Sequence, residues 1–125
     1  MQYPVIVKLV LEKGIDNIKV PGSIKGPALT EAGQVLAKER RYEEAGKAFF
    51  FANNTRELLE AGDWLAQQGR FKDASYFFRY SNDKQRMETC AHGCIDQNQY
   101  TEALALFRAS NNENMITFMR ENFGV

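Results

Sequence analysis

The chain has 125 residues, 44% of them apolar, and its 16 Lys and Arg residues balance its 16 Asp and Glu residues. This length suits one domain, and the apolar fraction excludes a disordered chain. Zero net charge argues against a dedicated nucleic-acid binder, because such a protein needs a basic surface. No apolar run approaches the roughly 20 residues that cross a bilayer. The lack of a signal peptide and of a disulfide framework leads us to expect a soluble, cytoplasmic protein.

Residues 1–28 are predicted to form an N-terminal appendage. Residues 4–13 favour a helix, with Pro4 in its first turn and Gly14 at its end, because a helix would cover the apolar face of the following segment. A buried strand over 5–11 is the alternative, since short apolar runs fit both. Residues 15–27 are predicted to be a small hairpin or an extended loop, with a type II turn at Pro21-Gly22. This loop is either a spacer or a functional segment.

From residue 29 onward the sequence repeats every 29 residues. Aromatic residues occupy positions 42, 71 and 100, alanines occupy 45, 74 and 103, and phenylalanines occupy 49, 78 and 107. Large residues at 29, 58 and 87 and small residues at 32, 61 and 90 keep the same step. A period of about 20–50 residues indicates a stacked-repeat architecture. We therefore divide the chain into repeats at 29–57, 58–86 and 87–112.

Each repeat is predicted to contain two amphipathic helices. In the second repeat both helices carry apolar residues at i, i+3 and i+7, namely Leu58, Ala61, Leu65 and Phe71, Ala74, Phe78. Gly33 and Gly62 let the paired helices approach closely. Polar residues after each second helix are expected to cap the next helix, and these are Asn53, Asn54, Asn82, Asp83, Asn111 and Asn112.

The last segment, residues 113–123, is predicted to be a capping helix. Its residues Ile116, Met119 and Phe123 fall at the first-helix positions of the repeat. Single repeats cannot bury their apolar faces alone, so about three are needed for stability. The sequence therefore predicts an all-α fold of three helix pairs with this cap and the N-terminal helix and loop packed on the stack.

The second repeat resembles the tetratricopeptide (TPR) pattern of large, small-small, large, Gly, aromatic, Ala, aromatic and small residues. The matching residues are Leu58, Ala61-Gly62, Leu65, Gly69, Phe71, Ala74, Phe78 and Ser81. The period of 29 is shorter than the usual ~34 residues, and the proline at the end of the second helix is absent, so the chain also resembles the solenoids of vesicle coats and ciliary transport. The resemblance implies a right-handed superhelix and a protein-interaction module.

The resemblance also implies that exposed residues of the first helices line a concave partner-binding face. These are Gln34, Lys38, Asp63, Gln67, His92 and Asp96, together with Thr30, Leu59 and Glu88. One Lys against two Asp and one Glu favours a neutral to mildly basic peptide over an acidic one.

A second predicted partner-binding surface is aromatic. Four rings fall off the core stripe of the second helices, and these are Phe50, Phe51, Tyr76 and Tyr80. Exposed together, they would bind a partner or a second copy of the chain. The alternative is that residues 1–28 fold over them.

Cys90, His92 and Cys94 are the residues most suggestive of a metal or redox site. The two thiols lie at i and i+4, but His92 points to another side of the helix, and zinc needs three or four ligands. Cys90 falls at the position of Ala32 and Ala61, so we interpret both cysteines as core residues and predict no metal and no cofactor.

We expect a non-catalytic interaction module, an adaptor or assembly subunit, that binds a protein or peptide and neither nucleic acid nor membrane. A self-associating homodimer is the alternative, and an enzyme or metal-binding domain around the cysteines is a third hypothesis. Charge is graded along the chain: residues 1–28 carry four Lys against two acids, and residues 87–125 carry two Arg against five acids.

Overall fold

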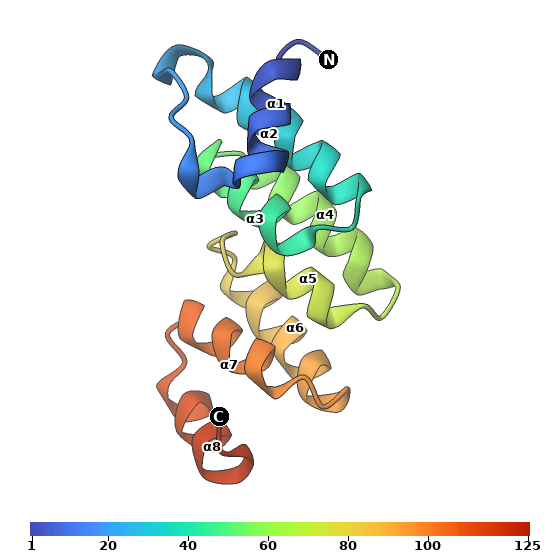
Figure 1. The fold of residues 1–125 in the computed structure, drawn as a ribbon. Helices are drawn as coiled ribbons and strands as arrows, with labels where there is room; N and C mark the ends of the chain where they lie inside the picture. Colours follow the sequence, from blue (N-terminus) through green and yellow to red (C-terminus); the bar gives the residue numbers. More distant parts are fainter. The chain divides into compact units, whose positions relative to one another are not determined.

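The computed structural model describes all 125 residues and contains eight α-helices and one short 3-10 helix (Figure 1). They are α1 (Pro4–Lys13), η1 (Ile15–Asn17), α2 (Gly22–Lys38), α3 (Tyr42–Phe51), α4 (Thr55–Gln67), α5 (Phe71–Phe78), α6 (Lys84–Asp96), α7 (Tyr100–Ala109) and α8 (Glu113–Phe123). Successive helices pack as antiparallel pairs. The all-α prediction is therefore confirmed, and the arrangement is consistent with a helical repeat.

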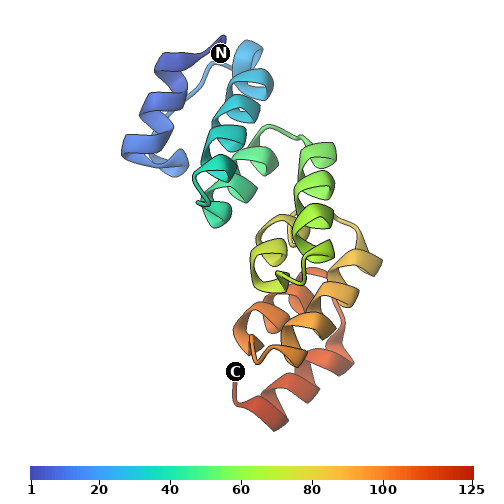
Figure 2. The same ribbon diagram turned by 90° about the vertical axis from the view of Figure 1, so that its right-hand side faces the viewer.

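The chain divides into two compact bodies, residues 1–58 and residues 59–125. We call them the N-terminal body and the C-terminal body and describe each by itself. In the N-terminal body α2 packs against both α1 and α3 (Figure 2). In the C-terminal body α6 packs against α5 and α7, and α7 packs against α8. None of the helices combines the length and apolar character that a membrane span requires.

The backbone repeats with the same period as the sequence. Left-handed residues within the repeats occur at Arg40, Gly69 and Asn98, with φ of 61°, 73° and 61°. A second series, between one second helix and the next first helix, consists of Asn53, Asn82 and Asn111, with φ of 54°, 59° and 57°. Members of each series are 29 residues apart, so both turns of the helical hairpin recur in register.

The polar residues after the second helices cap the following helices, as predicted. The side-chain Oδ1 atoms of Asn54, Asp83 and Asn112 accept hydrogen bonds from backbone N–H groups three residues later, at 3.2, 3.0 and 3.1 Å. These bonds satisfy helix N–H groups that have no partner within the helix.

Two glycines allow the close helix pairing. A Cβ atom on Gly33 would lie 2.5 Å from a ring carbon of Phe49, and one on Gly62 would collide in the same way with the ring of Phe78. Both phenylalanines are fully buried, as is Phe107 in the third repeat. The core positions of the repeat are therefore those that the sequence predicted.

Residues 4–13 form a helix, which confirms that prediction over the buried strand. The carboxylate of Glu31 on α2 accepts hydrogen bonds from the backbone N–H groups of Gln2 and Tyr3, at 2.6 and 2.8 Å. Glu31 thereby fastens the residues that lead into α1 to α2, while α1 itself has no side-chain cap. At the other end, the Arg41 guanidinium donates to the carbonyl of Leu11 at 3.2 Å.

The predicted loop or hairpin over residues 15–27 is wrong, because η1 occupies Ile15–Asn17 and α2 begins at Gly22. Gly22 is helical, so the predicted type II turn is also absent. Pro27 lies inside α2. A proline clashes with the Cβ of the residue before it when that residue is helical, but Gly26 has no Cβ, so the helix continues through this position.

The C-terminal body ends with the predicted helix α8. Ile116 and Met119 are buried, and the ring of Phe123 stacks on Tyr100 with centroids 4.1 Å apart. Gly124 follows in the left-handed conformation, which is the usual end of a helix. The predicted helix over residues 113–123 is therefore confirmed.

Candidate functional site

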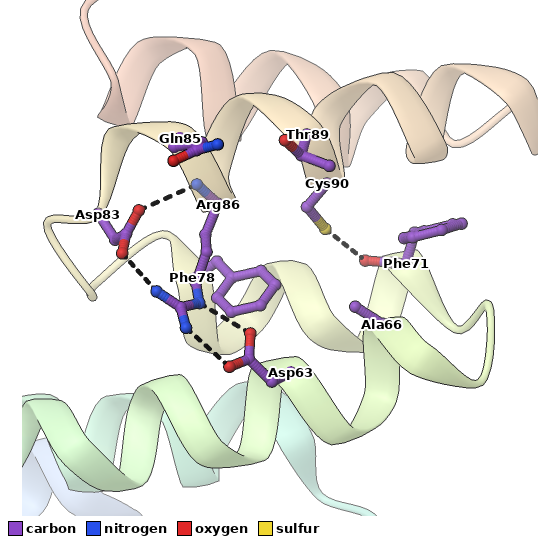
Figure 3. A pocket seen from close by; sticks show the side chains of 9 residues that line it. All are labelled: Asp63, Ala66, Phe71, Phe78, Asp83, Gln85, Arg86, Thr89 and Cys90. Atoms are coloured by element: carbon purple, nitrogen blue, oxygen red, sulfur yellow. Dashed lines mark hydrogen bonds and ion pairs between the residues drawn. The ribbon is translucent and has the colours of Figure 1, made fainter.

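A pocket of about 360 Å³ opens in the C-terminal body between α4 and α6 (Figure 3). Its floor is apolar and its mouth is charged. The lining residues are Asp63, Ala66, Phe71, Phe78, Asp83, Gln85, Arg86, Thr89 and Cys90. We call it the α4–α6 pocket.

One guanidinium bridges two carboxylates at the mouth of this pocket. Arg86 donates to both oxygens of Asp63, at 2.8 and 2.9 Å, and to Oδ2 of Asp83 at 2.6 Å (Figure 3). These hydrogen bonds, chiefly those to Asp63 and then the one to Asp83, raise the pKa of Arg86. The backbone N–H of Arg86 is the main cause that lowers the pKa of Asp83. The cluster therefore carries two negative charges and one positive charge.

The charged cluster includes the capping residue of the second repeat, which differs from the capping residues of the first and third repeats. In the first and third repeats the capping residue is an asparagine whose amide donates to a polar side chain, Asn54 to Thr30 at 3.0 Å and Asn112 to Glu88 at 3.2 Å. In the second repeat the capping residue is Asp83, which has no amide to donate. Its second oxygen accepts from Arg86 instead, and Arg86 reaches on to Asp63.

The floor of the pocket is formed by buried side chains. Phe78 and Cys90 are both buried, and the Cys90 thiol donates to the carbonyl oxygen of Phe71 at 3.3 Å. A hydrogen bond with Cys94 and burial raise the pKa of Cys90. The thiol therefore stays protonated near neutral pH and is a poor nucleophile. Burial of both cysteines confirms their interpretation as core residues.

Of the six residues predicted for a concave face, Asp63 lines the α4–α6 pocket. Gln67, His92 and Asp96 are exposed in the C-terminal body but do not line this pocket, and the His92 ring lies against Phe107 at 5.5 Å. The other two, Gln34 and Lys38, are exposed on α2 in the N-terminal body.

The predicted aromatic residues are divided between the two bodies. Phe50 and Phe51 on α3 are 45% and 37% exposed, with ring centroids 5.5 Å apart. Tyr76 and Tyr80 in the C-terminal body are half-buried, and the Arg79 guanidinium lies 4.9 Å from the centroid of Tyr76. Each body therefore holds two of the four predicted rings.

Sequence reasoning missed several residues that the structure brings to notice. Arg86 and Thr89 line the pocket, and Trp64 on α4 is 58% exposed. The available signal was Asp83, the only carboxylic acid in a series of capping residues that are otherwise asparagines. A charge at that position requires a partner nearby when it is partly buried.

The α4–α6 pocket offers apolar and charged side chains that can bind a ligand. No three side chains of the His, Cys, Asp or Glu type lie close enough together to hold a metal ion. Comparisons of the chain with protein-family models, with curated proteins and with solved structures found no match.

Proposed function

We propose that the chain is a non-catalytic, TPR-like protein-interaction module that binds a peptide segment of a partner in the α4–α6 pocket. The observation that carries this proposal is the combination of an apolar floor with a charged, partly exposed mouth in one pocket. Peptide-binding sites generally combine an apolar pocket for an anchor side chain with a polar rim that sets orientation. The turns and caps that recur every 29 residues support the repeat class.

The charge at the mouth selects the flanking residues of the peptide. Arg86 already donates to two carboxylates, so it is not available for an acidic ligand. Each carboxylate can accept further hydrogen bonds beyond those from Arg86. The net charge of the cluster is negative, so the pocket favours an apolar anchor residue with a Lys or Arg beside it.

The proposal is tested with three synthetic 12-residue peptides that share a central Leu-Phe pair flanked by Lys, Gln or Glu. Fluorescence anisotropy with the full chain should give tighter binding of the Lys-flanked peptide than of the Gln-flanked peptide. Asp63→Asn should weaken that binding about fivefold to tenfold, because it removes the excess negative charge at the mouth.

Asp73→Asn is the matched control, because Asp73 also pairs with an arginine, Arg70, at 2.8 Å but lies outside the pocket. It removes the same charge from the same body and should leave peptide binding unchanged. Equal affinities for the Lys-flanked and Gln-flanked peptides, or equal effects of the two substitutions, would remove the proposal.

Self-association is the second candidate function. Trp64 and Phe118 are 58% and 43% exposed on α4 and α8, and large exposed aromatic side chains are enriched at protein interfaces. Light scattering on the purified chain separates the two candidates. A monomer at every attainable concentration rules out the homodimer, and a dimer that Trp64→Ala or Phe118→Ala dissolves supports it.

A further inference from the structure

The N-terminal body carries a second hollow, also of about 360 Å³, where η1 and the segment after it lie beside α2 and the end of α3. Its apolar lining consists of Ile15, Ile18, Val20, Leu29 and Phe51. Ile15 and Leu29 are buried and form the floor, whereas the Phe51 ring is partly exposed at the edge. We call it the η1–α2 groove.

Two lysines of this groove have no carboxylate partner. The groove contains one acid, Asp16, and its carboxylate is already paired with Lys47 at 3.3 Å. Lys25 lies over the Phe51 ring, 5.9 Å from its centroid, and Lys19 forms no ion pair. Both lysines are exposed, so the groove presents two ammonium groups without a carboxylate partner beside an apolar floor.

We propose that the η1–α2 groove binds a peptide segment of a partner protein that has an apolar anchor residue flanked by carboxylates. Lys19 and Lys25 supply the complementary charge, and Phe51 supplies an exposed apolar wall against which the anchor packs. Complementary charge across an interface steers association and selects among partners. This site is independent of the α4–α6 pocket and has the opposite charge preference.

A peptide fits the groove better than single-stranded nucleic acid does. Base binding relies on stacking against aromatic rings and on a run of cations that follows the phosphates. Here the floor is aliphatic, the single ring already has Lys25 over it, and only two lysines line the groove. Aliphatic side chains pack well against the apolar side chains of a peptide, and two ammonium groups match two carboxylates.

The test uses the full chain and the synthetic peptides with a central Leu-Phe pair flanked by Glu, Gln or Lys. Fluorescence anisotropy should give tighter binding of the Glu-flanked peptide than of the Gln-flanked peptide, with an affinity for the Glu-flanked peptide that falls as salt is raised. The double substitution Lys19→Glu with Lys25→Glu should weaken Glu-flanked binding at least about tenfold. The double substitution Lys8→Glu with Lys13→Glu is the control, because it changes the net charge equally at two exposed lysines outside the groove.

A second pair of variants tests the apolar wall. Phe51→Ala should weaken binding of the Glu-flanked peptide, whereas Phe118→Ala removes a ring of similar exposure in the C-terminal body and should have no effect. Circular dichroism melts confirm that each variant remains folded. Both comparisons are independent of Asp63, so failure here leaves the proposal for the α4–α6 pocket standing.

Three outcomes would overturn the inference. The first is that the Glu-flanked peptide binds no better than the Lys-flanked peptide once the α4–α6 pocket is disabled by Asp63→Asn. The second is that oligo(dT) of 12 nucleotides binds the groove as tightly as the Glu-flanked peptide and competes with it. The third is a homodimer in light scattering that the Lys19 and Lys25 reversal dissolves, which would make a second copy of the chain the occupant.

Discussion

At the scale of single residues, the stability of the C-terminal body depends on a glycine that faces an aromatic ring. Gly62 on α4 lies against the Phe78 ring with no room for a Cβ atom. A glycine within a helix costs about 1 kcal/mol of stability relative to alanine. The close approach of the buried ring is what compensates for that cost, because the ring fills the space that a side chain would otherwise take.

We therefore expect Gly62→Ala to lower the free energy of unfolding by about 1–2 kcal/mol, since overpacking of a core outweighs the gain in helix propensity. Gly22→Ala is the control: it also lies in a helix, but a Cβ atom there meets nothing within 4 Å. That variant should be neutral or slightly stabilising. Urea unfolding measures both, and a Gly62→Ala protein as stable as the wild type would contradict the packing described for this glycine.

The buried thiol of Cys90 predicts a pH dependence of stability. The pKa of Cys90 is raised in the folded state by its hydrogen bond with Cys94 and by burial, whereas an unfolded thiol titrates near its ordinary pKa of roughly 8.5. This contribution to stability is complete below pH ~8.5 and declines as the pH rises further, because only the unfolded state then releases the proton.

The slope of unfolding free energy against pH above about 9 should be less negative in Cys90→Ala, by up to about 1.4 kcal/mol per pH unit. Alanine already stands at the equivalent positions 32 and 61, so the variant should fold. Denaturation measured between pH 7 and pH 10 gives the slopes, and identical slopes would show that Cys90 titrates normally in the native state.

At the scale of elements, the helices and turns follow the period of the sequence closely. The turn within each repeat needs one left-handed residue, which is Arg40 in the first repeat, Gly69 in the second and Asn98 in the third. Glycine adopts this conformation freely and asparagine tolerates it, whereas other residues incur about 1 kcal/mol. The first repeat therefore has the least favourable residue at this turn.

Arg40→Gly should raise the midpoint of thermal unfolding. The free energy of unfolding should rise by about 0.5–1 kcal/mol, a figure that includes the greater freedom of glycine in the unfolded chain. Asn98→Gly, at the equivalent turn, should give a smaller gain. Calorimetry compares the two variants. A destabilised Arg40→Gly protein would mean that the arginine side chain stabilises the fold by more than its left-handed backbone destabilises it.

The sequence predicted the structure correctly where a residue type at a repeat position has a single structural role. The positions of Phe49, Phe78 and Phe107 and the caps at Asn54, Asp83 and Asn112 followed from spacing alone. The prediction failed at residues 15–27, because proline and glycine residues in this segment favour a turn. Gly26 lacks the Cβ atom with which Pro27 would clash, but this advantage exists only once the helix has formed.

The two proposed binding sites were less predictable than the fold. Asp63 could be named as a candidate, but its partner Arg86 lies 23 residues away, and only the packed structure shows that Arg86 bridges it to Asp83. The η1–α2 groove forms between an irregular segment and two helices, so no periodic pattern marks it. Phe51 was predicted as part of an aromatic surface, and in the structure it lines this groove.

At the scale of the whole molecule, the zero net charge results from two bodies with different local charge. The N-terminal groove presents two unpaired lysines, and the C-terminal pocket presents two carboxylates around one arginine. Each hollow has an apolar floor of its own. We therefore propose two docking sites of opposite charge preference, of which the α4–α6 pocket is the primary one.

The most direct test of this account is a nuclear magnetic resonance titration of the labelled full chain with the Lys-flanked Leu-Phe peptide. We expect the backbone amide shifts to change mainly at the pocket, at Asp63, Arg86, Thr89 and Cys90, with the changes greatly reduced in Asp63→Asn. Shift changes confined to other surfaces, or no saturable change at millimolar peptide, would contradict a peptide-binding role for the α4–α6 pocket.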